Sequence, residues 1–192
     1  MYKNLSKYTI LLGSKSPRRA ALLKQSNLLF RKVFIDIEES FPKQLQPSFA
    51  AMYIAERKSM HFREFIEDEE ILLTSDTVVV IKNKILAKPK DKQEAKSMLK
   101  LLSGDTHEVI TAVCMRNENK KKVFYDSSKV YFENLDDEAI DYYIENFKPF
   151  DKAGAYGIQE WIGLTHIKRI EGSYFNIVGL PCHLIVEAIK NW

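Results

Sequence analysis

A largely apolar run with one acid inside it, Ile71 to Ile81, restricts the fold more than any other part of this chain. Its β-branched residues indicate a strand, and its length indicates a central one. Asp76 lies in the middle of the run, where burying an unpaired carboxylate would be costly. We therefore expect Asp76 to lie at the end of the strand, to bind a cation or to pair with a base, as an active-site acid does. The alternative is an acid at a strand edge that faces water.

Strands and helices alternate along the rest of the chain. Tyr8 to Leu12 predict a strand, followed by a helix with Ser16 as its N-cap and Pro17 in its first turn. Further helices are expected over 48–65, from Asp91 to about 104, from Asp136 or Asp137 to about 147 and over 181–190, and further strands over 85–87, 107–116 and 122–133. A hairpin joins the last two strands, and residues 148–173 are expected to be rich in loops. We predict a single α/β domain over residues 1–192, with a mixed twisted sheet flanked by helices and two lobes around a central cleft.

Composition excludes several classes of protein. A chain of 192 residues, 45% of them hydrophobic, buries enough surface to fold without disulfides. Cys114 and Cys182 are too far apart for a zinc pair, and we expect two buried thiols. The excess of three basic residues and a pI of about 8.7 argue against a nucleic-acid polymer as partner. Because no apolar stretch approaches the ~20 residues of a membrane span, we expect a soluble, cytoplasmic protein with no membrane partner.

The segment from Gly13 to Arg19 is a candidate phosphate site. It places the guanidinium groups of Arg18 and Arg19 at a junction between a strand and a helix, where backbone N–H groups lack partners. A helix N-terminus attracts anions, and arginine matches the geometry of phosphate oxygens. The alternative is a capped helix whose two arginines are solvated.

Two lysines and one glutamine complete the candidate site. Lys58 lies on the predicted second helix, and Lys88 precedes Pro89, which holds the backbone before it extended. Gln159 ends a segment that begins at Asp151 and contains two glycines, which allow close approach to a ligand. Its amide both donates and accepts hydrogen bonds, as recognition of a base edge requires. The alternatives are solvated lysines and a tight turn with Gln159 pointing outward.

Six segments, taken in order, resemble the Maf family of nucleoside triphosphate pyrophosphatases. The resemblance runs from Leu11 to about Leu184, and the segments are 14–19 with 22–23, 75–79, 88–89, 102–104 with 106–109, 151–159, and 172–176 with 179–181. Glu160 and Trp161 depart from it, since glycine usually follows the position of Gln159 in the family.

The resemblance implies hydrolysis of a nucleoside triphosphate between its α and β phosphates, with Mg²⁺ or Mn²⁺ as cofactor and a homodimer as the assembly. Asp76 would activate water, and a threonine after it, here Thr77, resembles the branch that acts on dTTP and UTP. The other implied roles are choice of the base, by Arg18, Thr77 and Gln159; phosphate binding, by Ser14, Arg19, Lys58 and Lys88; and a metal near Asp76 and Glu39, with Glu38 an equal claimant by spacing.

Two other functions are compatible with these residues. The family is also described as inhibiting septum formation, so the chain would then be a nucleotide-binding regulator of cell division without essential turnover. A second enzyme class would hydrolyse modified nucleotides and differ only in its contacts with the base. Asp76 discriminates the regulator from the enzymes, because binding requires the basic residues but no acid that activates water.

Overall fold

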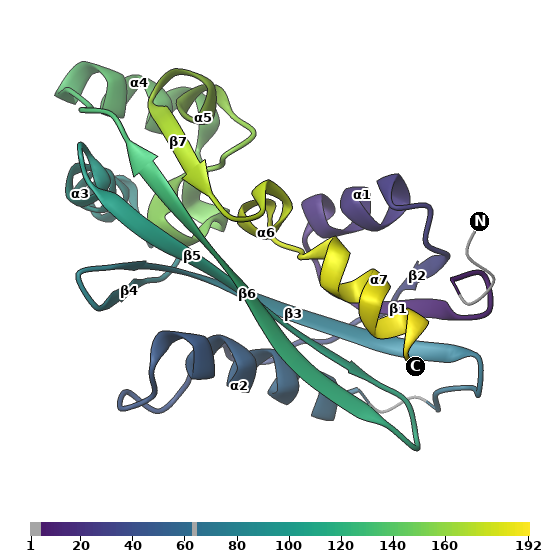
Figure 1. Ribbon diagram of the computed structural model, residues 1–192. Coiled ribbons are helices and arrows are strands. Elements are labelled where there is room, and N and C mark those ends of the chain that lie inside the picture. Colours follow the sequence, from purple (N-terminus) through teal and green to yellow (C-terminus); the bar gives the residue numbers. More distant parts are fainter. Residues whose placement is uncertain (1–4, 63–64) are drawn as a thin grey trace. The chain divides into compact units, whose positions relative to one another are not determined.

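The computed structural model describes residues 5–62 and 65–192, in which seven strands form one mixed sheet (Figure 1). The strands are β1 (Thr9–Gly13), β2 (Phe30–Lys32), β3 (Glu70–Ile81), β4 (Lys84–Leu86), β5 (Thr106–Arg116), β6 (Lys121–Phe132) and β7 (Ile167–Glu171). Their order in the sheet is β2-β1-β3-β5-β6-β7, and β4 pairs with β3. The helices are α1 (Pro17–Gln25), α2 (Pro47–Met60), α3 (Lys92–Leu102), α4 (Asp137–Phe147), α5 (Trp161–Thr165), α6 (Tyr174–Val178) and α7 (Cys182–Lys190). The predicted mixed α/β class is confirmed.

The described residues group into two compact units. Of the described residues, the first unit draws on 5–62, 65–76, 111–126 and 179–192, and the second on 77–110 and 127–178. The chain therefore passes between the units within β3, β5 and β6. The single domain and the central cleft stay predictions.

In the first unit, β1 pairs in parallel with both β2 and β3, so that Ile10 lies opposite Phe30 on one side and Ile71 on the other. Helices α1 and α7 lie on one side of these strands and α2 on the other (Figure 1). Because helices cover both faces, nearly every residue of β3 is buried. The long apolar run therefore forms the central strand that the sequence predicts.

Local capping signals place several elements where the sequence predicts them. The Ser16 hydroxyl accepts from the Arg19 backbone N–H at 3.5 Å, and the carboxylates of Asp91 and Asp136 accept from Glu94 N and Ala139 N, both at 2.8 Å. The helix predicted over 48–65 ends earlier, at Met60, and two residues of that range, 63 and 64, lie outside the described residues.

Two strands and two helices were not predicted. Strand β2 has only three residues, two of them charged, so it gives almost no periodic signal. The loop prediction for 148–173 is wrong over α5 and over β7, which pairs antiparallel with β6 at the edge of the sheet and exposes its charged side chains. Helix α6 begins at Tyr174, directly after the stretch expected to be rich in loops, and no helix was predicted there. Its buried Asn176 amide donates to Val109 O and to Ser128 Oγ, both at 2.9 Å.

Cys114 and Cys182 are both free. Cys114 is buried, with its thiol 3.4 Å from Ser59 Oγ, whereas Cys182 is only half-buried. Within 5–62 and 65–192, none of the helices has the length and apolarity that crossing a membrane demands.

One buried hydrogen bond fastens α2 to β3. The Thr74 hydroxyl in β3 donates to the Ala55 carbonyl in α2 at 2.6 Å. We expect Thr74→Val, which keeps the shape and removes the donor, to lower the free energy of unfolding by about 1 kcal/mol in denaturant titrations. Thr165→Val is the control, because the hydroxyl of this exposed residue bonds to Trp161 O within α5. Equal losses in the two variants would contradict the assignment.

Candidate active site

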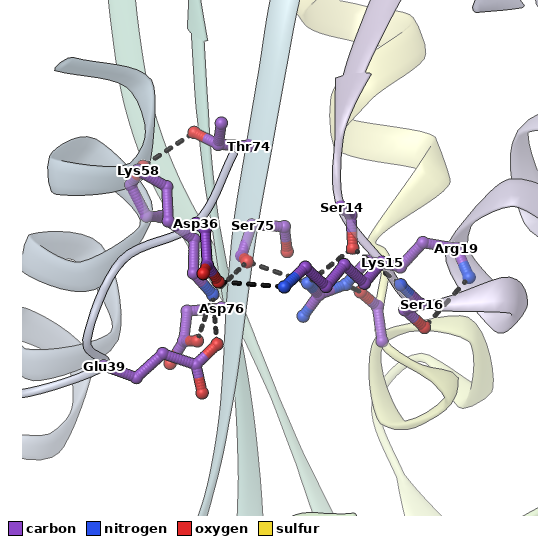
Figure 2. A network of polar contacts seen from close by, with 12 residues as sticks. Ser14, Lys15, Ser16, Arg19, Asp36, Glu39, Lys58, Thr74, Ser75 and Asp76 are labelled. Atoms are coloured by element: carbon purple, nitrogen blue, oxygen red, sulfur yellow. Dashed lines mark hydrogen bonds and ion pairs between the residues drawn. The ribbon is translucent and has the colours of Figure 1, made fainter. Parts of the chain in front are cut away.

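Asp76 lies in the middle of β3 and is only 6% exposed. Its Oδ1 atom is 2.8 Å from Lys58 Nζ, which reaches it from α2 (Figure 2). Of the three situations expected for this acid, pairing with a base is therefore found. The expectations that Asp76 lies at the end of the strand or at a strand edge facing water are both wrong, because helices on both sides bury this part of β3.

Lys58 joins two carboxylates to the backbone of β3. Its Nζ atom lies 2.8 Å from Glu39 Oε1 as well as 2.8 Å from Asp76 Oδ1, and it donates to Ser75 O at 3.2 Å. An ammonium group has three N–H donors, so all three have an acceptor. Glu39 is the more exposed of the two acids. Spacing left Glu38 and Glu39 as equal candidates for the acid near the metal, and of these two Glu39 is the one that contacts Lys58.

Burial raises the pKa of Asp76, because it disfavours the charged carboxylate. The charge of Lys58 and its hydrogen bond oppose this effect, Glu39 adds to it, and Arg19 opposes it. The net direction is upward. Asp76 is therefore a stronger base than an exposed aspartate, which suits proton abstraction near neutral pH.

Arg19 is buried and held by backbone carbonyl groups. Its Nε donates to Gly179 O at 2.9 Å, and one terminal nitrogen donates to Ser75 O at 2.8 Å and to Ser14 Oγ at 3.3 Å. Burial lowers the pKa of Arg19, against the opposing charges of Asp76 and Glu39. Ser75 O thus accepts from Arg19 and from Lys58. Sequence reasoning missed this carbonyl, because side-chain patterns carry no signal for a backbone acceptor.

The junction between β1 and α1 places Ser14 beside this cluster. Ser14 Oγ also accepts from Ser16 N at 3.2 Å, which fixes the turn into α1. A Cβ on Gly13 would lie 2.5 Å from Ile35 Cδ1, so a larger residue here would force the Ile35 side chain to shift. Lys15 pairs with Asp36 at 2.8 Å (Figure 2). The segment leading to Glu39 therefore packs against the junction.

The first unit thus brings together Ser14, Arg19, Glu39, Lys58 and Asp76. Arg18 is half-buried in the first turn of α1, in the same unit.

The remaining candidates belong to the second unit. Thr77 is half-buried and follows Asp76 in β3, whereas Lys88 and Gln159 are exposed. Lys88 follows Ala87, whose carbonyl accepts from Gly154 N at 3.2 Å. The end of β4 and the segment that carries Gln159 are therefore joined by a backbone hydrogen bond. The roles assigned to these residues stay predictions.

The carboxylates of Asp76 and Glu39 fit a hard divalent cation. Mg²⁺ is usually held by one or two carboxylates, with waters and substrate phosphates as its other ligands. Each carboxylate keeps acceptor capacity beyond its bond to Lys58. Among the described residues, no group of three or more His, Cys, Asp or Glu residues is placed to hold a metal. A cation here would therefore take oxygen ligands from water or from substrate.

Comparison with known proteins gives one consistent result. The sequence profile of one family, described as Maf-like protein, matches residues 9–192. A dTTP/UTP pyrophosphatase of Porphyromonas gingivalis is 46% identical over 195 residues, covering 100% of this chain and 98% of the relative. Proteins with the same description from Flavobacterium psychrophilum and Parabacteroides distasonis are 49% and 41% identical, covering 98% and 100% of this chain and 97% and 100% of the relatives.

The pairing of Asp76 with Lys58 predicts a pH-dependent stability. The pKa of Asp76 is higher in the folded state than in the unfolded chain, so between these two pKa values the folded protein keeps a proton that the unfolded chain has lost. The free energy of unfolding therefore falls as pH rises from the unfolded-state pKa to the folded-state pKa. Lys58→Met removes the main opposing group and extends this interval upward. We expect a loss of about 3 kcal/mol in unfolding free energy near pH 7, smaller at about pH 5, in denaturant titrations.

The control is the double variant Lys58→Met with Asp76→Asn, which has no carboxyl group to titrate at this position. The difference in unfolding free energy between this double variant and Asp76→Asn alone should be the same near pH 7 as at about pH 5. A loss in Lys58→Met that is the same at both pH values would contradict the pairing.

Proposed function

Since the chain belongs to the Maf family, we propose that it is a nucleoside triphosphate pyrophosphatase that hydrolyses dTTP and UTP. The observation that carries the proposal is the buried Asp76, which is paired with Lys58 and lies close to the charge of Arg19, while Lys58 also pairs with Glu39. A general base and a cluster of cations suit the attack of water on the α phosphorus of a triphosphate, which breaks a phosphoanhydride bond. Thr77, after this acid, supports the dTTP/UTP branch over the one that acts on 7-methyl-GTP.

In this proposal Asp76 orients a water molecule and takes its proton. The water oxygen forms a bond to the α phosphorus, and the bond from that phosphorus to the oxygen bridging to the β phosphorus breaks. Nucleoside monophosphate and pyrophosphate leave. Burial, which makes the Asp76 carboxylate more basic, favours this proton transfer.

The cations bind the triphosphate and stabilise the charge that develops on pyrophosphate. In the proposal these cations are Arg19, Lys58 and Lys88, and the Ser14 hydroxyl binds phosphate together with them. Lys58 has no spare donor, so it exchanges an existing bond for a phosphate oxygen, and its bond to the more exposed Glu39 is the easier one to give up. The donors of Arg19 bond to backbone carbonyls, so its fixed charge is part of its contribution.

A divalent cation, Mg²⁺ or Mn²⁺, completes the proposal. Asp76 and Glu39 would hold it, and when bound it supplies positive charge to the phosphate oxygens. In the proposal, the specificity for the nucleobase is determined by Arg18, Thr77 and Gln159.

We further propose a cytoplasmic homodimer that acts on small nucleotides and not on nucleic-acid polymers. Family resemblance supports the dimer, and the two free cysteines fit a reducing compartment.

Asp76→Asn tests the proposal. The amide keeps the shape of the side chain but cannot take a proton from water. We expect pyrophosphate release from dTTP and UTP, measured with Mg²⁺ and with Mn²⁺, to fall to background. Nucleotide affinity, measured by calorimetry, should stay within about tenfold of the wild-type value. Turnover equal to wild type would reject the assignment, and a wild type that binds UTP without releasing pyrophosphate would favour the regulator.

Lys88→Ala tests the contribution of the second unit to phosphate binding. Losing a charge-assisted hydrogen bond should raise KM for UTP by about 10- to 150-fold, which corresponds to about 1.5–3 kcal/mol. Lys90→Ala, two residues away and also exposed, should leave KM unchanged. An unchanged KM in Lys88→Ala would place Lys88 among the solvated lysines.

A further inference from the structure

A buried ionic network surrounds the segment that carries Gln159. The Glu160 carboxylate accepts a hydrogen bond from the Tyr143 hydroxyl and pairs with Lys152 Nζ at 3.0 Å. The Tyr143 oxygen in turn accepts from Gly157 N at 2.9 Å. Lys152 Nζ is also 2.7 Å from Asp151 Oδ1. Glu160 thus connects α4, the Gly157 backbone and Lys152, all within the second unit.

The network is built into the core of this unit. The Lys152 side chain is only 9% exposed, and Tyr143 is fully buried. A buried ammonium is costly unless it is paired, and Glu160 is the less exposed of its two partners. Burial and Glu160 both raise the pKa of Tyr143, which keeps its hydroxyl protonated as a donor. Glu160 therefore has a fixed position despite its place in a loop.

Close backbone contacts extend this constraint to both sides of Gln159. A Cβ on Gly157 would lie 2.8 Å from the Glu160 carboxyl carbon, so the carboxylate is folded against the backbone two residues before Gln159. A Cβ on Gly163 would lie 1.9 Å from Ile158 O, so α5 packs directly on the residue before Gln159. Ile158 is itself buried. Gln159 is exposed, but the backbone that directs its side chain is fixed on both sides.

We propose that Glu160 is a positioning residue for base recognition: anchored by Lys152 and Tyr143, it holds Gln159 in the orientation that reads a pyrimidine. The proposal rests on the proposed function, in which Gln159 contacts the base. Preorganisation is the physical reason. A glutamine whose backbone is already fixed loses less entropy on binding, and it offers its donor and acceptor in one direction, which favours one base edge over another.

The test compares variants of the full chain by their preference for UTP over ATP. Calorimetry with the α,β-methylene analogues of UTP and ATP measures two dissociation constants without turnover. We expect Glu160→Ala and Tyr143→Phe each to lower the ratio of affinities by about tenfold, while Glu160→Gln, whose amide oxygen still accepts, retains most of it. Asp151→Asn is the matched control, because it removes the charge of the more exposed partner of the same Lys152 and keeps the Glu160 carboxylate with its bond to Tyr143, and its ratio should equal that of the wild type.

A double-mutant comparison separates positioning from general destabilisation. If Glu160 acts through Gln159, Glu160→Ala should change the ratio in the wild-type background but not in the Gln159→Ala background. An equal change in both backgrounds, or wild-type ratios in both Glu160→Ala and Tyr143→Phe, would overturn the proposal. If Glu160→Ala does not fold, Tyr143→Phe decides by the same comparison.

Failure of the positioning role of Glu160 can be distinguished from failure of the proposed pyrophosphatase activity. Failure of the wild type to release pyrophosphate from UTP would reject the pyrophosphatase while leaving the affinity ratio measurable. Failure of the wild type to bind either analogue would overturn both.

Discussion

The burial of one carboxylate in the central strand dictates the arrangement around it. Asp76 needs a cation inside the first unit, and only a helix packed on β3 brings Lys58 to it. The bond between Thr74 and Ala55 fastens that helix two residues from the acid. Ser75 O then orients both Lys58 and Arg19, so the strand that buries the acid also positions the groups that compensate its charge. The stability of this unit and the proposed chemistry therefore involve the same few atoms.

In the second unit, too, a buried charge is compensated by partners of opposite charge, but here the buried charge is positive. Lys152 is buried there and pairs with Glu160 and with the more exposed Asp151. The first cluster surrounds a candidate base, whereas the second surrounds a loop whose end carries an exposed amide. In both, compensating a buried charge fixes the backbone nearby, because each partner restricts the segment from which it projects. Such fixed segments suit recognition better than mobile loops do.

Much of the fold follows from local sequence signals, and most of the site does not. The sequence signals for the strand around Asp76 and for the helix caps Ser16, Asp91 and Asp136 are strong, because each signal depends on residues that are close in sequence. Strands β2 and β7 are short or charged, and only their neighbours in the sheet make them strands. The position of Asp76 indicated that it needs a cation, but 18 residues separate it from Lys58, and nothing local selects that lysine. Likewise, the sequence marked Glu160 as a departure from the family resemblance, but it gave no sign of the contacts with Tyr143 and Lys152.

The fully occupied ammonium of Lys58 has a consequence for which anions the first unit retains. An incoming oxygen must displace a carboxylate already in contact, so a lone chloride or a single phosphate gains little from the exchange. A chain of linked phosphates compensates that loss with several contacts at once, because its further oxygens reach other donors. If the triphosphate binds here as proposed, the resting arrangement therefore favours polyanions over small ions.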